Sequence, residues 1–311
     1  GHNRLGGVPI TFTVAAGGGN LDGFSSKIVT TDSDGRALAS LTLGLVEGTE
    51  NNRVEATFPG DPGQPVVFTA SAMIPGDAAE TSISLGAEYT SGDYGTSTET
   101  KMWYFPVTLR YEADRYMLAL TVPYVVVEGT GNVVATGSAR GLPRTTTLTT
   151  SRTESGLGDI ELMGSYAVAQ GVDWRLGLGG LIKFGTAEEQ DNLSTGEDDV
   201  AAQLEADKTW GNNTFYGTAG YKILGDPPGI DYDNVFYGSV GISHRLDATR
   251  VAGAELYAQE APLPGVDGKS ELMVFLGGKP TPRTRLTGYL IAGFADGSPD
   301  WGVGVVLKMG R

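Results

Sequence analysis

The stretch PDWGVGVVLKM at residues 299–309 carries apolar side chains on alternate positions. Trp301, Val303, Val305, Leu307 and Met309 alternate with Gly302, Gly304, Val306 and Lys308. This two-residue period predicts a β-strand with one apolar face. The pattern recurs about a dozen times from residue 81 onward, often with an aromatic residue near one end. Repeated strands of this kind predict a β-barrel with lipid outside and water or polar packing inside.

The composition agrees with a barrel and excludes several other classes. The chain has 311 residues, 47 of them glycine, and is only 40% hydrophobic, without an uncharged apolar run long enough for a transmembrane helix. Net charge is −15 and no basic stripe is visible, which argues against nucleic-acid binding. Cysteine is absent, so disulfides and thiolate metal sites are excluded. Because no signal peptide opens the chain, an exported protein is expected to be in its mature or trimmed form.

Twelve alternating segments can be counted, an even number as expected for a single-chain bacterial barrel. They are residues 81–90, 102–112, 115–127, 158–169, 172–186, 199–209, 213–224, 233–246, 249–259, 269–279, 283–294 and 299–309. The connections after even-numbered strands are short, and those after odd-numbered strands are longer. Barrels of this class have short periplasmic turns and long external loops. The sequence therefore predicts a twelve-stranded antiparallel outer-membrane barrel at residues 81–311, with its C-terminus in the periplasm.

The same alternation assigns the two faces of the wall. Leucines, valines and phenylalanines are predicted to face lipid: Phe105, Val107, Leu109, Leu118, Leu120, Leu176, Leu178, Leu286 and Leu290. The charged residues of the strands then face inward and are predicted to line the lumen: Arg110, Glu161, Arg175, Lys183, Glu205, Lys222, Glu255 and Glu271. An unpaired Arg or Lys facing lipid near mid-membrane costs about 2–4 kcal/mol. The consistent inward placement of charge therefore supports this register.

Residues 1–73 form a different unit, followed by a linker at 74–80. Short strands are predicted at 8–15, 26–31, 37–43, 53–58 and 65–72, which indicates a β-sandwich. The segments GVPITFTVAAGGG (7–19), TTDSDGRALASLTL (30–43) and PVVFTASA (65–72) closely resemble the bacterial Ig-like domain of the invasin and intimin type. Such domains usually have further strands before the GVP segment. We therefore expect either a trimmed N-terminus or a strand supplied by another chain through β-augmentation.

The second half carries another resemblance. SGLGDIELMGSYAV (155–168) and GFADGSPDWGVGVVLKM (293–309) resemble outer-membrane transporter-like barrels of the phenol meta-pathway type. That resemblance implies a transport function with hydrophobic or aromatic solutes. The chain ending also resembles the C-terminal signal for barrel insertion, although Gly310 and Arg311 stand where that signal usually ends on an aromatic residue.

No enzyme chemistry is predicted. His2 and His244 are the only histidines, and Ser243 would face the opposite side of the strand from His244. No nucleophile, base and orienting residue can be combined, so no catalytic residue and no cofactor are expected. Two acidic groups follow the fifth and seventh strands: Glu188, Glu189, Asp191, Glu197, Asp198 and Asp199, and Asp226, Asp231 and Asp233. Their spacing matches no calcium-loop pattern, so a solvated acidic rim is expected rather than a metal site.

The connection at 128–157 is the longest and holds Arg140, Arg144 and Arg152 in an otherwise acidic protein. Long loops are usually functional or disordered. One hypothesis is that this loop folds into the lumen and places its arginines against Glu161 or Glu205, as a constriction. The alternative is a mobile surface loop.

Three functions remain open on the sequence. The first is a passive channel or transporter for small solutes, with residues 1–73 as a periplasmic interaction domain. The second is a plugged structural anchor whose Ig-like domain docks an envelope-spanning or filament assembly. The third is an adhesin of the invasin type, although there the exported domains follow the barrel. Outer-membrane lipid, lipopolysaccharide and a periplasmic protein are the expected partners.

Overall fold

The computed structural model describes residues 4–44, 46, 48–60, 63, 65–72, 79–94, 98–130, 133–136, 138–143, 151–187 and 193–310. For 133–136 and 138–143 only the backbone is described. The chain divides into two compact units, Gly1–Ala78 and Ala79–Arg311. No helix among the described residues is long and apolar enough to cross a membrane.

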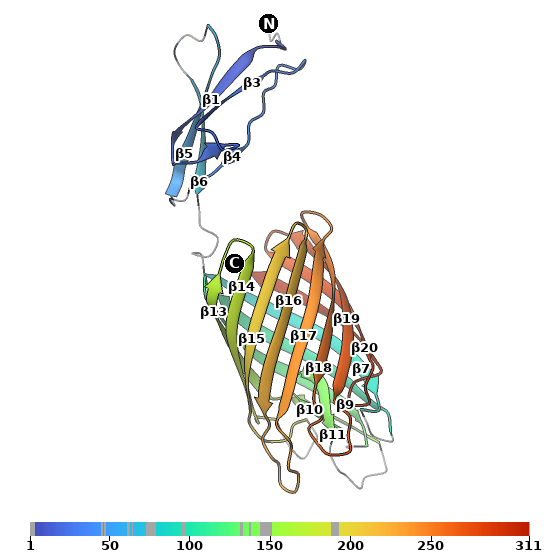
Figure 1. Cartoon of the computed structure of the whole chain (residues 1–311). Coiled ribbons are helices and arrows are strands. Elements are labelled where there is room, and N and C mark those ends of the chain that lie inside the picture. The colour runs from blue at the N-terminus through green and yellow to red at the C-terminus, as the bar shows by residue number, and fades with distance from the viewer. Residues whose placement is uncertain are drawn as a thin grey trace. The chain divides into compact units, whose positions relative to one another are not determined.

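The first unit is built from two small antiparallel sheets (Figure 1). The strands are β1 (Pro9–Ala16), β2 (Asn20–Leu21), β3 (Ser26–Thr30), β4 (Leu41–Thr42), β5 (Gly48–Thr57) and β6 (Val66–Ala72). One sheet has the order β3-β1-β5-β6, and the other pairs β2 with β4. Phe12, Leu21, Val54 and Ala56 form a buried core between them.

The strand predicted at 37–43 was wrong in its extent, because only Leu41–Thr42 is a strand. Its partner β2 offers two residues, Asn20 and Leu21, since glycines interrupt the chain on both sides of them. Ala37 and Ala39 still pack against the core without joining a ladder.

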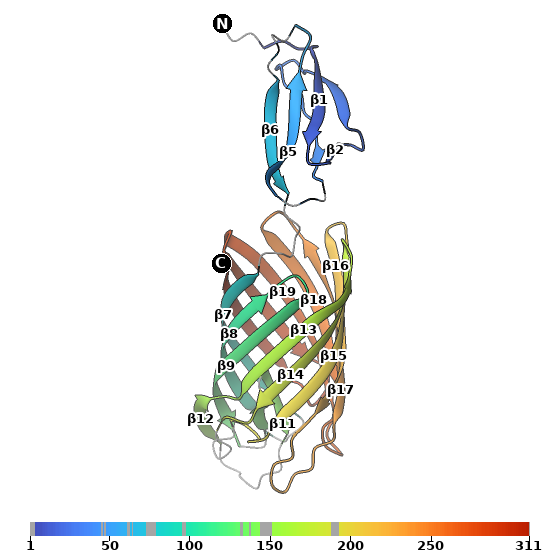
Figure 2. The ribbon, with the colours of Figure 1, turned by 90° about the vertical axis from the view of Figure 1, so that its left-hand side faces the viewer.

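The second unit is a closed antiparallel barrel of twelve strands, as predicted (Figures 1 and 2). The wall consists of β7 (Glu80–Gly92), β8 (Thr100–Glu112), β9 (Tyr116–Gly129), β13 (Ile160–Gln170), β14 (Trp174–Phe184), β15 (Asp199–Trp210), β16 (Asn213–Ile223), β17 (Val235–Arg245), β18 (Arg250–Gln259), β19 (Lys269–Thr281), β20 (Thr284–Gly293) and β21 (Trp301–Gly310). Each strand pairs with the next, and β21 closes the barrel on β7 from Trp301↔Ser91 to Gly310↔Ser82.

The connection predicted at 128–157 is not one long loop. It contains a hairpin, β10 (Val133–Thr136) and β11 (Ser138–Pro143), and then β12 (Arg152–Leu157). β12 pairs with Tyr124–Gly129 on the same edge of β9 that pairs with β13 further down. The two are separated at Gly158, opposite Pro123, which has no N–H to donate to the ladder. Gly158 N donates to Pro123 O at 2.9 Å, so β12 extends the fourth wall strand.

The connections differ strongly between the two ends of the barrel. The turns at 113–115, 171–173, 211–212, 246–249 and 282–283 are short and share one end, called here the turn end. Both termini of the barrel unit also lie there, because Gly310 pairs with Ser82. The longer connections, with β10 and β11, share the opposite end, called here the loop end (Figure 1).

Candidate functional site

The wall of the barrel has an apolar outer face and a mixed inner face. On β8, Trp103, Phe105, Val107 and Leu109 are exposed, whereas the alternating Met102 is fully buried. The same alternation exposes the residues predicted to face lipid: Phe105, Val107, Leu109, Leu118, Leu120, Leu176, Leu178, Leu286 and Leu290. An exposed apolar surface of this kind around a closed wall is characteristic of transmembrane barrels.

Two rows of aromatic residues bound this apolar surface. At the loop end the Tyr89 ring centroid lies 4.7 Å from that of Trp103 and 5.3 Å from that of Trp301. At the turn end the Tyr111 and Tyr116 rings are 6.0 Å apart. Eight residues separate Trp103 from Tyr111 on β8, which is roughly 26 Å along an extended strand. With a strand tilt of about 40°, the rows stand roughly 20 Å apart, close to the height of a lipid-facing band.

All eight residues predicted to line the lumen occupy inner-face positions of the register. They are Arg110 on β8, Glu161 on β13, Arg175 and Lys183 on β14, Glu205 on β15, Lys222 on β16, Glu255 on β18 and Glu271 on β19. Towards the turn end, Arg110 Nε lies 3.0 Å from Glu112 Oε2 and Arg175 Nε lies 3.0 Å from Asp207 Oδ1. These pairs are half exposed.

Tyrosines and amides link the inner charges in the middle of the wall. Tyr237 Oη donates to Gln203 Oε1 at 2.7 Å, and Gln203 Nε2 donates to Glu205 Oε1 at 2.7 Å. The Lys222 ammonium lies 5.5 Å from the centroid of the Tyr237 ring, a cation–π geometry. Across the closing strand β21, Tyr289 Oη on β20 donates a hydrogen bond to Glu88 on β7. The inner face is therefore a hydrogen-bonded polar surface and carries charges of both signs.

Four inner aromatic rings lie against glycines on the neighbouring strand. The directly paired residues are Tyr216 with Gly241, Tyr237 with Gly220, Phe275 with Gly253 and Tyr289 with Gly304. A Cβ added at any of these glycines would overlap the ring of its partner. Each ring consequently lies along the wall instead of projecting across the lumen, and this keeps space free inside the barrel.

The most buried charges form a cluster at the loop end of β13, β14 and β15. Lys183 is 2% exposed, and its Nζ lies 3.1 Å from Asp159 Oδ2 and 3.2 Å from Asp199 Oδ2. Loop residues close over the three charges: Ser194 Oγ donates to Asp159 Oδ2 at 2.6 Å, and Thr195 Oγ1 is 3.2 Å from Lys183 Nζ. A buried cation with two carboxylate partners holds the connection after β14 against the inner wall.

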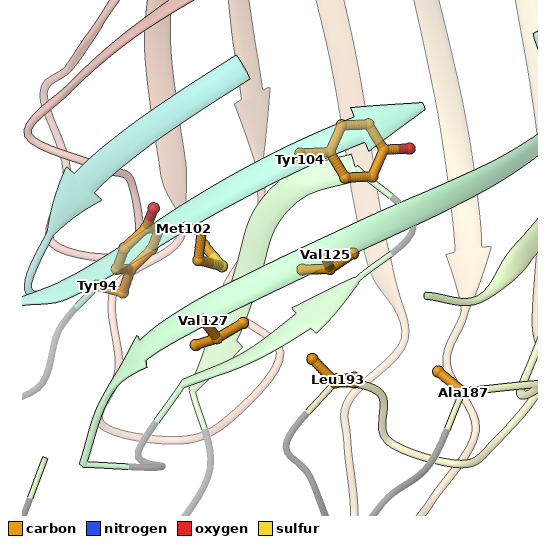
Figure 3. Close-up of a cluster of buried hydrophobic side chains, with 7 residues drawn as sticks. All are labelled: Tyr94, Met102, Tyr104, Val125, Val127, Ala187 and Leu193. Carbon is orange, nitrogen blue, oxygen red and sulfur yellow. The ribbon is translucent and has the colours of Figure 1, made fainter. Parts of the chain in front are cut away.

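An apolar cluster beside this site narrows the loop end further (Figure 3). Ala187 and Leu193 from the connection after β14, and Tyr94 from the connection after β7, are buried together with inner-face residues of β8 and β9. Those partners are Met102, Tyr104, Val125 and Val127. Thr90 and Tyr94 share a hydrogen bond of 2.7 Å, and burial raises the pKa of Tyr94, which therefore stays protonated. Connections between strands thus enter the barrel at this end.

The arginines proposed as a constriction are only partly described. Arg144 lies outside the described residues, and of Arg140 only the backbone is described, in β11, which lies against β7 and β8. Arg152 in β12 is exposed at the loop end. Among the described residues no ion pair joins Arg152 to Glu161 or Glu205, and the constriction by the three arginines stays a prediction. The strand pairing of β12 with β9 holds Arg152 beyond these carboxylates.

The acidic groups act as acceptors for backbone amides. Asp198 Oδ1 accepts from Gly185 N at 2.9 Å, Asp199 Oδ1 from Gly225 N at 3.0 Å and Asp226 Oδ1 from Tyr232 N at 2.7 Å. Glu188, Glu189 and Asp191 lie outside the described residues. Within the described part of the chain no group of three or more His, Asp or Glu side chains could hold a metal ion.

His244 lies on the outer face at the turn end, with Nδ1 2.8 Å from Asn213 Oδ1. The neighbouring Ser243 faces the inside of the barrel, because successive residues of a strand alternate. The two side chains therefore cannot act together.

Comparisons with known proteins agree with this fold. An outer membrane channel from Pseudomonas putida F1 has a similar structure, with a TM-score of 0.56 and 16% identity over 81% of this chain and 99% of that chain. NanC porin aligns with a TM-score of 0.48 and 11% identity over 73% of this chain and 97% of that chain. No curated protein sequence matches the chain.

One family model matches the sequence itself. It is described as "Putative MetA-pathway of phenol degradation" and matches residues 72–278, which cover the barrel from β7 to most of β19. The match spans more than half of the chain, and it agrees with the sequence resemblance found at 155–168. The chain therefore belongs to this family.

Proposed function

We propose that the barrel is a channel of the bacterial outer membrane through which small solutes move passively. The observation that carries this proposal is the alternation of an exposed apolar face with a charged, hydrogen-bonded inner face around a closed twelve-stranded wall. Eight strands make a barrel filled by its own side chains, and sixteen enclose a wide aqueous channel. Twelve strands, with rings lying flat against the wall, support a narrow pore.

The loop end supports selection of solutes by size. The Lys183 cluster and the apolar cluster around Leu193 bring the connection after β14 into the barrel. The family description concerns phenol degradation, and the Pseudomonas putida protein is an outer membrane channel. Both support small solutes, aromatic ones among them, as the cargo of this chain.

We further propose that the turn end faces the periplasm and that residues 1–73 form an Ig-like periplasmic domain. β7 begins at the turn end, so the chain enters the barrel from that side. Two small sheets around Phe12 and Leu21 support an Ig-like unit. The outer face would contact lipid and, on the loop side, lipopolysaccharide. Cleavage of residues 1–73 by a protease added to intact cells would contradict this topology and favour the adhesin alternative.

Conductance in planar lipid bilayers tests the channel. The wild-type chain is expected to give small, discrete current steps. A variant in which a Gly-Ser linker replaces 186–196 is expected to give larger steps, because the buried side chains of Leu193, Ser194 and Thr195 are removed from the inside of the barrel. A variant with the linker in place of 263–267, at the same end, controls for shortening a loop. A closed barrel without current in the wild type and in both variants would overturn the proposal.

A structural anchor is the second candidate, and one observation favours it. β6 is an edge strand on which Val66, Val67 and Phe68 are 57%, 43% and 53% exposed. An apolar edge strand offers unpaired backbone groups to a partner strand. Cross-linking through a cysteine placed at Thr69, in cells, would detect such a partner. An anchor is expected to cross-link to a partner and to give no conductance. A channel is expected to give conductance whether or not it cross-links to a partner.

A further inference from the structure

The turn end of the lumen carries three cations that share one cavity. Arg245 on β17, Lys279 on β19 and Arg285 on β20 line a polar cavity of about 480 Å³, whose lining also includes Asp247 and Arg250, which form an ion pair with each other. Hydroxyl groups of Thr209, Thr214 and Ser243 line the same space. The three cations are exposed to solvent, so this cavity opens at the end of the barrel. We call it the basic mouth.

The register explains why these charges gather. Along β19 the inner face passes from Phe275 through Gly277 to Lys279, and along β20 from Tyr289 through Thr287 to Arg285. Phe275 pairs with Tyr289 and Gly277 with Thr287, so Lys279 and Arg285 follow at the same end of one hairpin. Arg245 belongs to the adjoining hairpin of β17 and β18, where it pairs with Val251.

The three cations of the basic mouth differ from four other cations at this end, each of which has a carboxylate partner. Arg110, Arg175, Arg250 and Lys308 each lie within 4 Å of a carboxylate oxygen, on Glu112, Asp207, Asp247 and Glu80 respectively. Among the residues that the structure describes, Arg245, Lys279 and Arg285 form no ion pair. In a chain of net charge −15, three neighbouring cations without an acidic partner repel one another and are available to an anion.

The surroundings of the basic mouth favour a carboxylate with an apolar body. Arginine forks match the two oxygens of a carboxylate, and hydroxyl groups can donate to the remaining lone pairs. A volume of about 480 Å³ lies within the range of small-molecule sites. Deeper in the lumen, the paired rings of Phe275 and Tyr289 offer apolar contact along the same part of the wall. Inorganic phosphate would use the cations but gain nothing from those rings.

We propose that the basic mouth binds small organic carboxylates, aromatic acids among them, as they leave or enter the channel at its turn end. This inference rests on the proposed channel function. It predicts a preference for anions at one end of a pore whose middle and loop end are rich in carboxylates. The positive potential of the three cations attracts the carboxylate and raises its concentration at that end of the channel.

The test compares the wild-type chain with a triple variant, Arg245→Gln, Lys279→Gln and Arg285→Gln. Single-channel currents in planar bilayers are recorded under a KCl gradient and with benzoate, benzyl alcohol or inorganic phosphate added on the turn side. We expect benzoate to reduce the wild-type chloride current at a concentration at least tenfold lower than in the triple variant. Benzyl alcohol is expected to have no effect. A control carrying Arg115→Gln and Lys208→Gln, which lose exposed ion pairs with Asp114 and Asp173 outside the cavity, should behave as the wild type does.

Two results would overturn the inference: equal block of both proteins by benzoate, or block of the wild type by phosphate as strongly as by benzoate. Calorimetric titration of benzoate into the protein in detergent micelles gives a readout that needs no current. If the wild type gives no current but binds benzoate, and the triple variant does not bind it, the channel is overturned and the site is kept. Current without such binding would keep the channel and overturn the site.

Discussion

Lys183 and Arg175 lie on the inner face of the same strand, β14, at opposite ends of the barrel. Lys183 is buried between Asp159 and Asp199 under a folded loop, whereas Arg175 pairs with Asp207 beside a short turn and stays 41% exposed in its side chain. The same wall therefore uses charge for two purposes. At the loop end charges hold a connection between strands inside the barrel, and at the turn end they stay exposed to solvent.

This difference follows from the connections. Long connections can reach back into the barrel, and their Ser194 and Thr195 supply the hydrogen bonds that buried charges need. Short turns cannot, so inner-face cations beside them meet water, a neighbouring carboxylate or a solute. In the proposed channel, size is selected at the loop end and charge at the turn end.

Replacing each of these two cations by methionine gives the largest contrast. Lys183→Met leaves two buried carboxylates without their cation, and breaking a buried pair in this way costs about 3–5 kcal/mol. Arg175→Met removes a half-exposed pair and is expected to cost less than about 1 kcal/mol. Urea unfolding in phospholipid vesicles, followed by tryptophan fluorescence, measures both. Equal losses in the two variants would remove the distinction between the ends.

Leu193→Ala tests the apolar anchor of the loop end. Truncating a buried leucine costs about 2–5 kcal/mol, and the low end is expected because a loop can collapse around the space. Hydrogen exchange should quicken in residues 193–198 and the single-channel current should become noisier. Leu246→Ala, in an exposed turn at the other end, is the matched control and should change neither. Unchanged exchange in Leu193→Ala would show that the Lys183 cluster alone holds the loop.

The strands were predictable because the lipid-facing positions must be apolar over the whole width of the wall. Because of that requirement, apolar residues recur at every second position in each strand from 81 to 309, and the charged residues lie on the inner face. β12 is not predicted as a strand from the sequence, because its outer-face residues include the polar Thr153 and Ser155. Those positions belong to the part of the strand beyond the apolar belt, where alternation of apolar and polar residues is not required.

The Lys183 cluster could not be predicted either. Asp159, Lys183 and Asp199 are far apart in sequence and meet only through the register of three strands. The available signal is the acidic group Glu197, Asp198 and Asp199, which the sequence alone predicts to belong to a solvated acidic rim. In the structure Asp198 is exposed as predicted for a rim, whereas Asp199 is buried beside Lys183 under Ser194 and Thr195.

Gly304→Ala tests how the middle of the lumen between the two ends is kept open. The added methyl group would overlap the Tyr289 ring, so the ring must turn inward and its hydrogen bond to Glu88 weakens. Overpacking of this kind costs about 1–3 kcal/mol, and we expect a reduced single-channel current. Gly288→Ala on the outer face of β20 is the matched control, because its methyl group meets open space apart from Gly304 O at 4.0 Å. A loss of stability in both variants would point to strand conformation instead of the ring.

The smallest expected effect concerns the turn at 246–249. Asp247 accepts hydrogen bonds from the backbone of Thr249 and from the side chain of Arg250, and these bonds hold its pKa below the usual range. A depressed pKa means that the ionised carboxylate stabilises the turn above the ordinary pKa of an aspartate, and that this stabilisation is lost as pH falls through the lower value. The protection factors of the Thr249 and Arg250 amides, which correct the exchange rate for its intrinsic dependence on pH, should therefore stay constant from pH 7 to 5 and fall only below about pH 4. Asp247→Asn should remove that acid dependence, and because Arg250 is then released at the edge of the basic mouth, benzoate binding should strengthen slightly and not weaken.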